Sequence, residues 1–133
     1  MKKLIISLVF TLLILTPSTA NAQSWQKRVS IANGREKVVS GFGIKIKFLD
    51  VLDDSRCPKG QTCVWAGNAK VKIQVFEGRR ASVFEINTNL SPQIATIGRY
   101  EIKLDSLEPR PDTAGKPDKG LYIAGFVIRK LAR

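Results

Sequence analysis

The chain has 133 residues, with 22 lysines and arginines against 11 acidic residues, and it contains no histidine. Its length fits one globular domain. The formal charge of +11 suits contact with anionic lipids, polyanionic glycans or acidic proteins, and equally a merely soluble surface. Without histidine the chain lacks the usual general base near neutral pH and a common zinc ligand. The composition therefore argues against histidine-based catalysis, and we expect no cofactor.

The first 22 residues have the three parts of a secretory signal peptide. Lys2 and Lys3 form a basic region, residues 4–15 are apolar, and Ala20-Asn21-Ala22 matches an A-x-A cleavage site. The apolar run is shorter than the ~18–20 residues that a membrane span needs. We therefore expect cleavage near Ala22, a mature domain over residues 23–133 without a transmembrane segment, and a periplasmic or extracellular location. Nucleic acid is not an expected partner, because export removes the protein from most of it and no binding motif is present.

Two short strands are predicted at the start of the mature chain. Apolar and polar residues alternate in residues 25–31, and Asn33-Gly34 is a strong turn signal. A second strand over residues 37–40 would complete a hairpin. Residues 42–51 form the clearest strand, because apolar side chains alternate with Lys45 and Lys47. The alternation changes phase after Phe48, which predicts a β-bulge or bend.

The rest of the chain continues the pattern of short strands. Residues 69–76 and 81–87 alternate on either side of Gly78 and predict a hairpin. Residues 88–99 read as a loop with a short strand or helical turn at 93–97, and residues 100–104 alternate again. Residues 108–120 are rich in proline and glycine and predict a surface loop.

Residues 121–128 are apolar on both faces. This predicts a strand that is covered on both sides or lies in a sandwich core. Gly125 within it predicts a close backbone approach or a bulge. Six to eight short strands with no helical repeat after the signal peptide indicate an all-β antiparallel fold, either a sandwich or a small barrel. We favour a single β-sandwich.

Four lysines define a candidate binding surface. Lys45 and Lys47 point outward from one predicted strand, and Lys70 and Lys72 from another. Like charges directly opposite one another destabilise a sheet. Either the two strands are not neighbours, or acidic residues of a third strand lie between the lysines. If the lysines lie side by side without acids, they form a basic platform for an anionic partner.

The segment from Asp50 to Asn68 contains both cysteines. Cys57 and Cys63 follow an export signal, so we expect them to form one disulfide. Closing so short a loop stabilises the fold by roughly 2 kcal/mol in the chain-entropy model. The spacing is not C-x-x-C, which argues against a redox or metal site.

Three acids precede the disulfide loop, namely Asp50, Asp53 and Asp54. They are weak calcium candidates, because calcium needs six or more oxygen ligands and the EF-hand spacing is absent. The simpler interpretation is that these acids hold turns and that one of them pairs with Arg56.

Lys59 and Trp65 are the candidate binding residues of this segment. Lys59-Gly60 lies at the tip of the cysteine loop, where a rigid lysine suits the pocket of a trypsin-like protease. An ordinary turn is the simpler interpretation. Trp65 follows the second cysteine, and we expect its ring to pack over the disulfide; stacking on a ligand is the alternative. Ala66-Gly67 would let the chain turn tightly into the next strand.

The sequence DDSRCPKGQTCVWAGNAKV resembles a motif of small exported bacterial proteins and lipoproteins, approximately D-S-R-C-P, then about four residues and C-x-W-A-G. The resemblance covers residues 48–75. That family has no assigned activity. The resemblance implies an envelope or secreted location and a Cys57–Cys63 disulfide, but no substrate and no catalytic residue. Unlike the lipoproteins, this chain has no cysteine at the cleavage site.

These observations predict an exported, disulfide-stapled binding or envelope-associated module and not an enzyme. Its expected partner is an anionic envelope component or another protein. One alternative is a secreted serine-protease inhibitor that presents the Cys57–Cys63 loop. A third is a carboxylate-dependent hydrolase, which the sequence disfavours because Asp53 and Asp54 are neighbours in a turn and nothing places an acid opposite them.

Overall fold

The computed structural model describes residues 25–132, so the predicted signal peptide lies outside the described residues. These residues contain eight strands and one short 3-10 turn, η1 (Lys119–Leu121). The strands are β1 (Gln26–Ala32), β2 (Glu36–Val39), β3 (Ile44–Asp54), β4 (Ala69–Glu77), β5 (Arg80–Asn87), β6 (Ile94–Ile97), β7 (Tyr100–Glu108) and β8 (Ile123–Lys130). Within this part of the chain no helical segment has the length and apolar character that a bilayer crossing requires.

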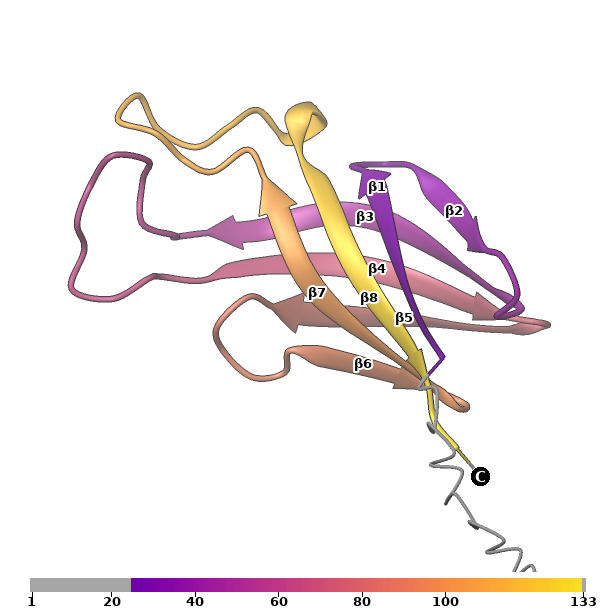
Figure 1. Ribbon diagram of the computed structural model, residues 1–133. Helices are drawn as coiled ribbons and strands as arrows, with labels where there is room; N and C mark the ends of the chain where they lie inside the picture. Colours follow the sequence, from indigo (N-terminus) through magenta and orange to yellow (C-terminus); the bar gives the residue numbers. More distant parts are fainter. Residues whose placement is uncertain (1–24, 133) are drawn as a thin grey trace, which may run out of the picture.

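The strands form two four-stranded antiparallel sheets, in the orders β1-β8-β7-β6 and β2-β3-β4-β5. The sheets lie face to face as two layers (Figure 1). This confirms the predicted antiparallel β-sandwich. The hairpin predicted around Gly78 is β4–β5, and the short strand predicted at residues 93–97 is β6.

The core lies between the two layers and follows from period-two alternation. Alternate apolar side chains of β3 and β4 are buried on one side, and those of β7 and β8 on the other. Phe48 of β3 meets Phe126 of β8 edge to face, with 6.2 Å between the ring centroids. The hydrophobic effect holds the layers together, because packing them face to face removes these side chains from water.

One predicted hairpin is wrong. Asn33-Gly34 does form a turn, but β1 pairs with β8 and β2 pairs with β3, so the turn carries the chain from one sheet to the other. The turn is held by both layers, because the N–H of Asn33 donates to the carbonyl of Tyr122 and that of Gly34 to Phe48. Pairing with the distant C-terminal strand therefore replaces the local pairing that the turn signal suggested.

The bulge predicted after Phe48 is confirmed, because the β3–β4 register shifts between Phe48 and Asp50. The close approach predicted at Gly125 is also present. A Cβ at this position would lie 2.3 Å from the Oγ of Ser106, next to a register shift in β7.

The apolar segment at residues 121–128 is covered on one side only. Tyr122, Ala124, Phe126 and Ile128 are buried in the sandwich core, whereas Leu121 and Ile123 are exposed. Of the two expectations for this strand, burial on both faces is therefore wrong and placement at a sandwich core is correct. The outer face of its sheet has no third layer in the described chain.

The connections are sorted between the two ends of the sandwich, as antiparallel topology requires. Long loops over residues 55–68, 88–93 and 109–122 gather at one end, which is on the left in Figure 1. Tight turns at residues 40–43, 78–79 and 98–99 lie at the other end, together with the start of β1 and the end of β8. Both ends contain candidate binding residues.

Candidate functional sites at the two ends of the sandwich

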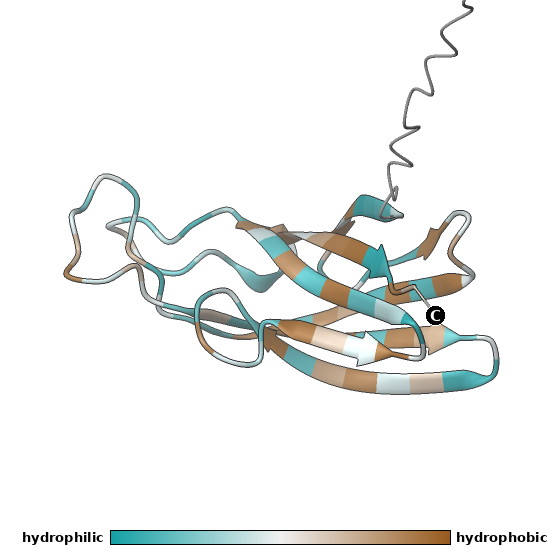
Figure 2. Cartoon of the chain, turned by 60° about the horizontal axis from the view of Figure 1, so that its bottom comes forward, coloured by the Kyte–Doolittle hydropathy of each residue, from teal (hydrophilic) through white to brown (hydrophobic). Residues whose placement is uncertain are grey.

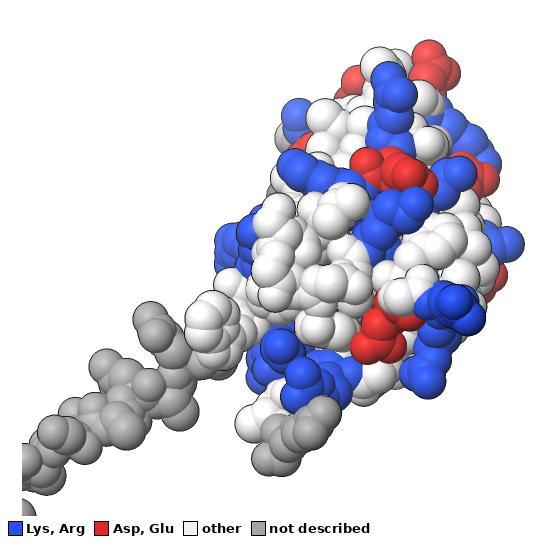
Figure 3. All heavy atoms as spheres, turned by 90° about the vertical axis from the view of Figure 1, so that its right-hand side faces the viewer, with Lys and Arg blue, Asp and Glu red and all other residues white. Residues whose placement is uncertain are grey.

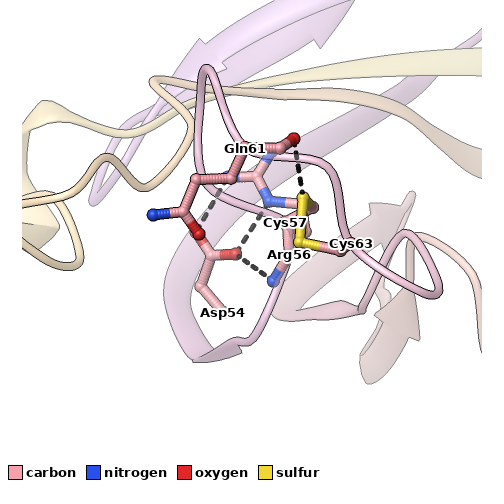
Figure 4. Close-up of a disulfide and its surroundings, with 5 residues drawn as sticks. All are labelled: Asp54, Arg56, Cys57, Gln61 and Cys63. Atoms are coloured by element: carbon pink, nitrogen blue, oxygen red, sulfur yellow. Dashed lines mark hydrogen bonds and ion pairs between the residues drawn. A yellow bond between two sulfur atoms is a disulfide. The ribbon is translucent and has the colours of Figure 1, made fainter.

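Cys57 and Cys63 are joined by a disulfide, with 5.9 Å between their Cα atoms (Figure 4). This confirms the predicted pairing. No free cysteine remains in the described residues. Because such bonds form and persist in oxidising environments, the disulfide indicates an oxidising compartment.

We call residues 55–68 the stapled loop. Besides the disulfide, the N–H of Cys57 donates to the carbonyl of Ala66 over 2.9 Å, and the N–H of Ser55 to that of Asn68 over 2.7 Å. The N–H of Lys59 donates to the carbonyl of Pro111 over 2.9 Å, which attaches the tip to the neighbouring long loop. The stapled loop is therefore fixed at its base and at its tip.

Gly67 is required where the stapled loop enters β4. Its φ is +72°, and a Cβ there would lie 2.0 Å from the carbonyl oxygen of Ser55. The tight turn predicted at Ala66-Gly67 is thus present. The next residue, Asn68, is buried, and its side-chain oxygen accepts the N–H groups of Asn89 and Leu90, each over 3.1 Å.

A buried ion pair lies at the base of the stapled loop. The Nε and Nη2 atoms of Arg56 donate to the two carboxylate oxygens of Asp54, each over 2.8 Å (Figure 4). The guanidinium also donates to the carbonyls of Leu107 and Pro109, and the hydroxyl of Tyr122 donates to Asp54 over 2.8 Å. Asp54 is 3% exposed and Arg56 is 9% exposed. The predicted pairing of Arg56 with an acid is confirmed.

This network shifts the pKa values of the Asp54 carboxyl and the Tyr122 hydroxyl. Burial by itself would raise the pKa of Asp54, but the hydrogen bonds from Arg56 and Tyr122 outweigh it, and the pKa of this carboxyl lies below its ordinary value. Burial and the neighbouring Asp54 carboxylate raise the pKa of the Tyr122 hydroxyl above its ordinary value. Asp54 therefore stays ionised as part of the scaffold and is not available as a proton donor.

Trp65 is not buried in the core. Its side chain is 56% exposed, and the neighbouring Val64 is fully exposed. The expectation of core packing is wrong because the stapled loop projects beyond the two sheets (Figure 1). Lys59 is exposed as predicted. Lys59, Val64 and Trp65 thus form an accessible surface on a rigid loop.

The three calcium candidates do not come together around a common point. Asp54 is bound by Arg56, Asp50 pairs with Lys119 over 2.7 Å, and Asp53 pairs with Lys116 over 3.5 Å. Within residues 25–132 no group of three or more potential ligands has the spacing for a metal ion. Each of the three carboxylates is paired with a cation.

A hollow of about 390 Å³ crosses the outer face of the β1-β8-β7-β6 sheet, but it is not acidic. Arg28 pairs with Asp105 over 3.4 Å on its wall, and Arg129 pairs with Glu101.

The four candidate lysines share one outer face, because β3 and β4 are neighbours. No two of them are directly opposite each other: Lys45 faces Phe76 and Lys47 faces Gln74 across the strand pair. The amine of Lys45 also lies 4.5 Å from the centre of the Phe76 ring. The possibility that the strands are not neighbours is thus excluded.

Acidic residues lie between these lysines. Lys72 is opposite Asp50 on one side and Glu85 on the other, and Lys70 is opposite Asp53. Glu36 of β2 accepts a hydrogen bond from Lys45 over 3.1 Å. Acids of the neighbouring strands β2 and β5 therefore lie beside the lysines, which is the second of the two expectations. Strand β3 itself supplies two further acids. The uncompensated platform is not formed on this face.

The opposite end of the sandwich carries a cluster of cations that no sequence pattern suggested. We call it the basic end; its cations are Lys27, Arg79, Arg80, Arg99 and Lys130. Arg80 pairs with Glu77 over 3.8 Å. The other four take part in no ion pair within the described residues, although Lys27 donates to the carbonyl of Ser40. Figure 3 views this end and shows blue groups around a patch of uncharged surface, with fewer red groups between them.

Backbone contacts hold the basic end together. The N–H of Lys130 donates to the carbonyl of Trp25 over 3.0 Å, and that of Leu131 to the carbonyl of Arg99 over 2.8 Å. The side chain of Trp25 is 71% exposed beside these cations. The cluster was not predictable because its members come from two separate turns, from the start of β1 and from the end of β8.

Comparison of the chain with protein-family models, with curated proteins and with solved structures finds no match in any of the three. The resemblance to the family of small exported proteins therefore stays a prediction.

Proposed function

We propose that this protein is an exported, non-catalytic binding module that contacts an anionic component of the cell envelope through its basic end. The composition supports a non-catalytic role, since histidine is absent. The disulfide and the signal-like N-terminus support export to the periplasm or the cell exterior.

The observation that carries this proposal is the separation of charge at the basic end. Among the described residues, four cations there make no ion pair and have no acid opposite them in a strand pair. Each lysine of the β3–β4 face has an acid opposite it or hydrogen-bonded to it, although only Lys45 makes an ion pair. A cation near an anionic membrane surface is worth about 1 kcal/mol, and the attraction falls within a Debye length. Exposed Trp25 adds an amphipathic ring of the kind that settles at a lipid–water interface.

The experiment is co-sedimentation of the mature protein with vesicles of phosphatidylglycerol and phosphatidylcholine, compared with vesicles of phosphatidylcholine alone. We expect binding to the anionic vesicles at low salt and roughly tenfold weaker binding near 0.5 M salt, since screening removes the attraction. Equal binding to both vesicle types would disprove the proposal.

Two matched variants locate the surface. The double substitution Arg99→Gln/Lys130→Gln removes two cations from the basic end and should weaken anionic-vesicle binding about tenfold or more. The control Lys70→Gln/Lys72→Gln removes two cations from the face where acids intervene and should have a small effect. If the control variant loses binding and the first variant does not, the β3–β4 face is the contact surface and the basic end is not.

A second candidate is the secreted serine-protease inhibitor, with another protein as the partner. It is favoured by the exposed Lys59 on a loop closed by the disulfide and held at its tip by Pro111. A loop already fixed in shape loses little entropy on binding. Incubation with trypsin at micromolar concentration tests it: slowed turnover that is lost in Lys59→Ala supports inhibition, whereas rapid cleavage after Lys59 without slowed turnover removes it.

A further inference from the structure

Strand β5 is a long unprotected edge. It is the last strand of its sheet, and in Figure 2 it runs along the lower margin of the molecule. Its first half is exposed on both faces: Ala81 and Val83 point outward, with Val83 50% exposed, and Phe84 on the inner side is only partly buried. Edges of this kind are templates for pairing with another strand.

The backbone groups that face outward from β5 follow from its hairpin. The register pairs Arg80 with Glu77 across a two-residue turn, so these residues form the closing hydrogen-bonded pair. Alternate residues then bond to β4, and Ala81, Val83 and Glu85 direct their N–H and C=O groups to the free edge. Asn87 falls in the same alternation, and its N–H points away from β4 and donates to the carbonyl of Pro92.

Within the described chain no further backbone hydrogen bond reaches Ala81, Val83 or Glu85. The loop over residues 88–93 covers only the final part of the strand. The open stretch of the strand is therefore residues 80–85, which is long enough to accept a second strand.

We propose that this edge pairs with the same edge of a second copy, which joins two β-sheets into one across a two-fold axis. An axis perpendicular to the sheet requires residues of the same face to meet. If the axis passes beside Ser82, residues of the same face meet, and the N–H and C=O groups that point to the free edge of one copy pair with those of the other. Ala81 then lies opposite Val83 of the second copy. Arg79, in the turn that leads into β5, comes next to Glu85 of the second copy.

Charge complementarity selects this register. It forms two Arg79–Glu85 contacts, one on each side of the axis, from residues that make no ion pair within the described part of one chain. On the inner face, Arg80 comes opposite the partly buried Phe84 of the second copy, a favourable cation–π combination. A register centred on Val83 would instead place Glu85 opposite Ala81 and leave both charges without partners.

The first measurement is sedimentation velocity of the mature protein over a range of concentrations. The interface is small, so we expect a reversible dimer with a dissociation constant on the order of 10 micromolar. A protein that stays monomeric to about a hundred times that concentration would overturn the proposal.

Charge exchange tests the register. Glu85→Arg or Arg79→Glu alone places like charges opposite each other twice, and each should weaken the dimer by roughly tenfold or more. The double variant Arg79→Glu/Glu85→Arg restores opposite charges and should recover the dimer to within about threefold. A double variant as weak as either single variant would overturn the proposed pairing.

A pair of valine variants tests the edge. Val83→Lys places a charge in the centre of the pairing and should abolish the dimer. Val38→Lys makes the same change at an exposed position of β2, at the other edge of this sheet, and should leave the dimer intact. Far-UV circular dichroism confirms that each variant is folded. A dimer that resists Val83→Lys, or that is lost equally in Val38→Lys, would show that β5 is not the contact.

Discussion

Arg56 is the residue that attaches the stapled loop to the sandwich. Its guanidinium contacts both oxygens of Asp54 and two backbone carbonyls of the opposite sheet and its following loop. Burying two charges is costly, but here the carboxylate also accepts a hydrogen bond from Tyr122, so the desolvated groups are satisfied. The network therefore defines the geometry at the base of the loop.

Arg56→Ala should destabilise the protein by about 3–5 kcal/mol, because it leaves the buried Asp54 carboxylate without its cation. Urea unfolding followed by tryptophan fluorescence measures the change. Arg110→Ala, in an exposed part of the neighbouring loop, is the control and should change stability by less than about 0.5 kcal/mol. Equal losses in the two variants would contradict this account of the network.

The same network predicts how stability depends on pH. The pKa of Asp54 is lowered by folding, so its contribution is complete above the ordinary value of about 3.9 and is lost as the pH falls below it. The pKa of Tyr122 is raised, so its contribution is present below about pH 10 and is lost as the pH rises above it. Urea midpoints from pH 2 to 11 should show both declines, and Tyr122→Phe should reduce the alkaline one. An unchanged alkaline decline in Tyr122→Phe would exclude this hydroxyl as its source.

Among the elements, the stapled loop is held in more than one way. The disulfide closes residues 57–63, while backbone hydrogen bonds and the Arg56 network hold the base independently. The strand pairing of the two sheets does not involve the disulfide. We therefore expect the disulfide to stiffen the loop without deciding the fold.

The double variant Cys57→Ser/Cys63→Ser should keep the β-sandwich and lose roughly 2 kcal/mol of stability, the value expected for so short a closed loop. Far-UV circular dichroism and urea unfolding measure the two quantities. Loss of the folded state, or no change in stability, would show that the loop is organised differently.

For the whole molecule, the main feature is the different character of the two ends. The long-loop end presents exposed Trp65 and Lys59 on a rigid support, and the basic end presents four cations that make no ion pair among the described residues. Because β5 strands would pair antiparallel in the proposed dimer, the two basic ends would point in opposite directions. The axis at Ser82 lies near the start of β5, so each basic end would lie beside the long-loop end of the second copy.

If both proposals hold, vesicle binding and dimer formation should be separable. Val83→Lys should bind anionic vesicles as a monomer, while Arg99→Gln/Lys130→Gln should form the dimer but bind the vesicles weakly. Co-sedimentation and sedimentation velocity measure the two properties. Loss of both properties in either variant would contradict their separation.

The strands, the bulge after Phe48, the close approach at Gly125 and the disulfide were all predictable from the sequence. Alternation and glycine placement act locally, and two cysteines allow only one intramolecular bond. Sheet partners depend on distant segments, so the turn at Asn33-Gly34 was predicted as a hairpin although it connects two sheets.

The position of Trp65 and the basic end were likewise decided by the tertiary structure. The indole is exposed because the stapled loop projects beyond the two sheets, and the loop is anchored through Arg56 to carbonyls of Leu107 and Pro109, which are distant in sequence. The cations gather because antiparallel strands bring separate turns to one end. Local patterning thus determined which residues form strands and which side chains are buried, while the packing of two sheets determined which charges are compensated and which face a partner.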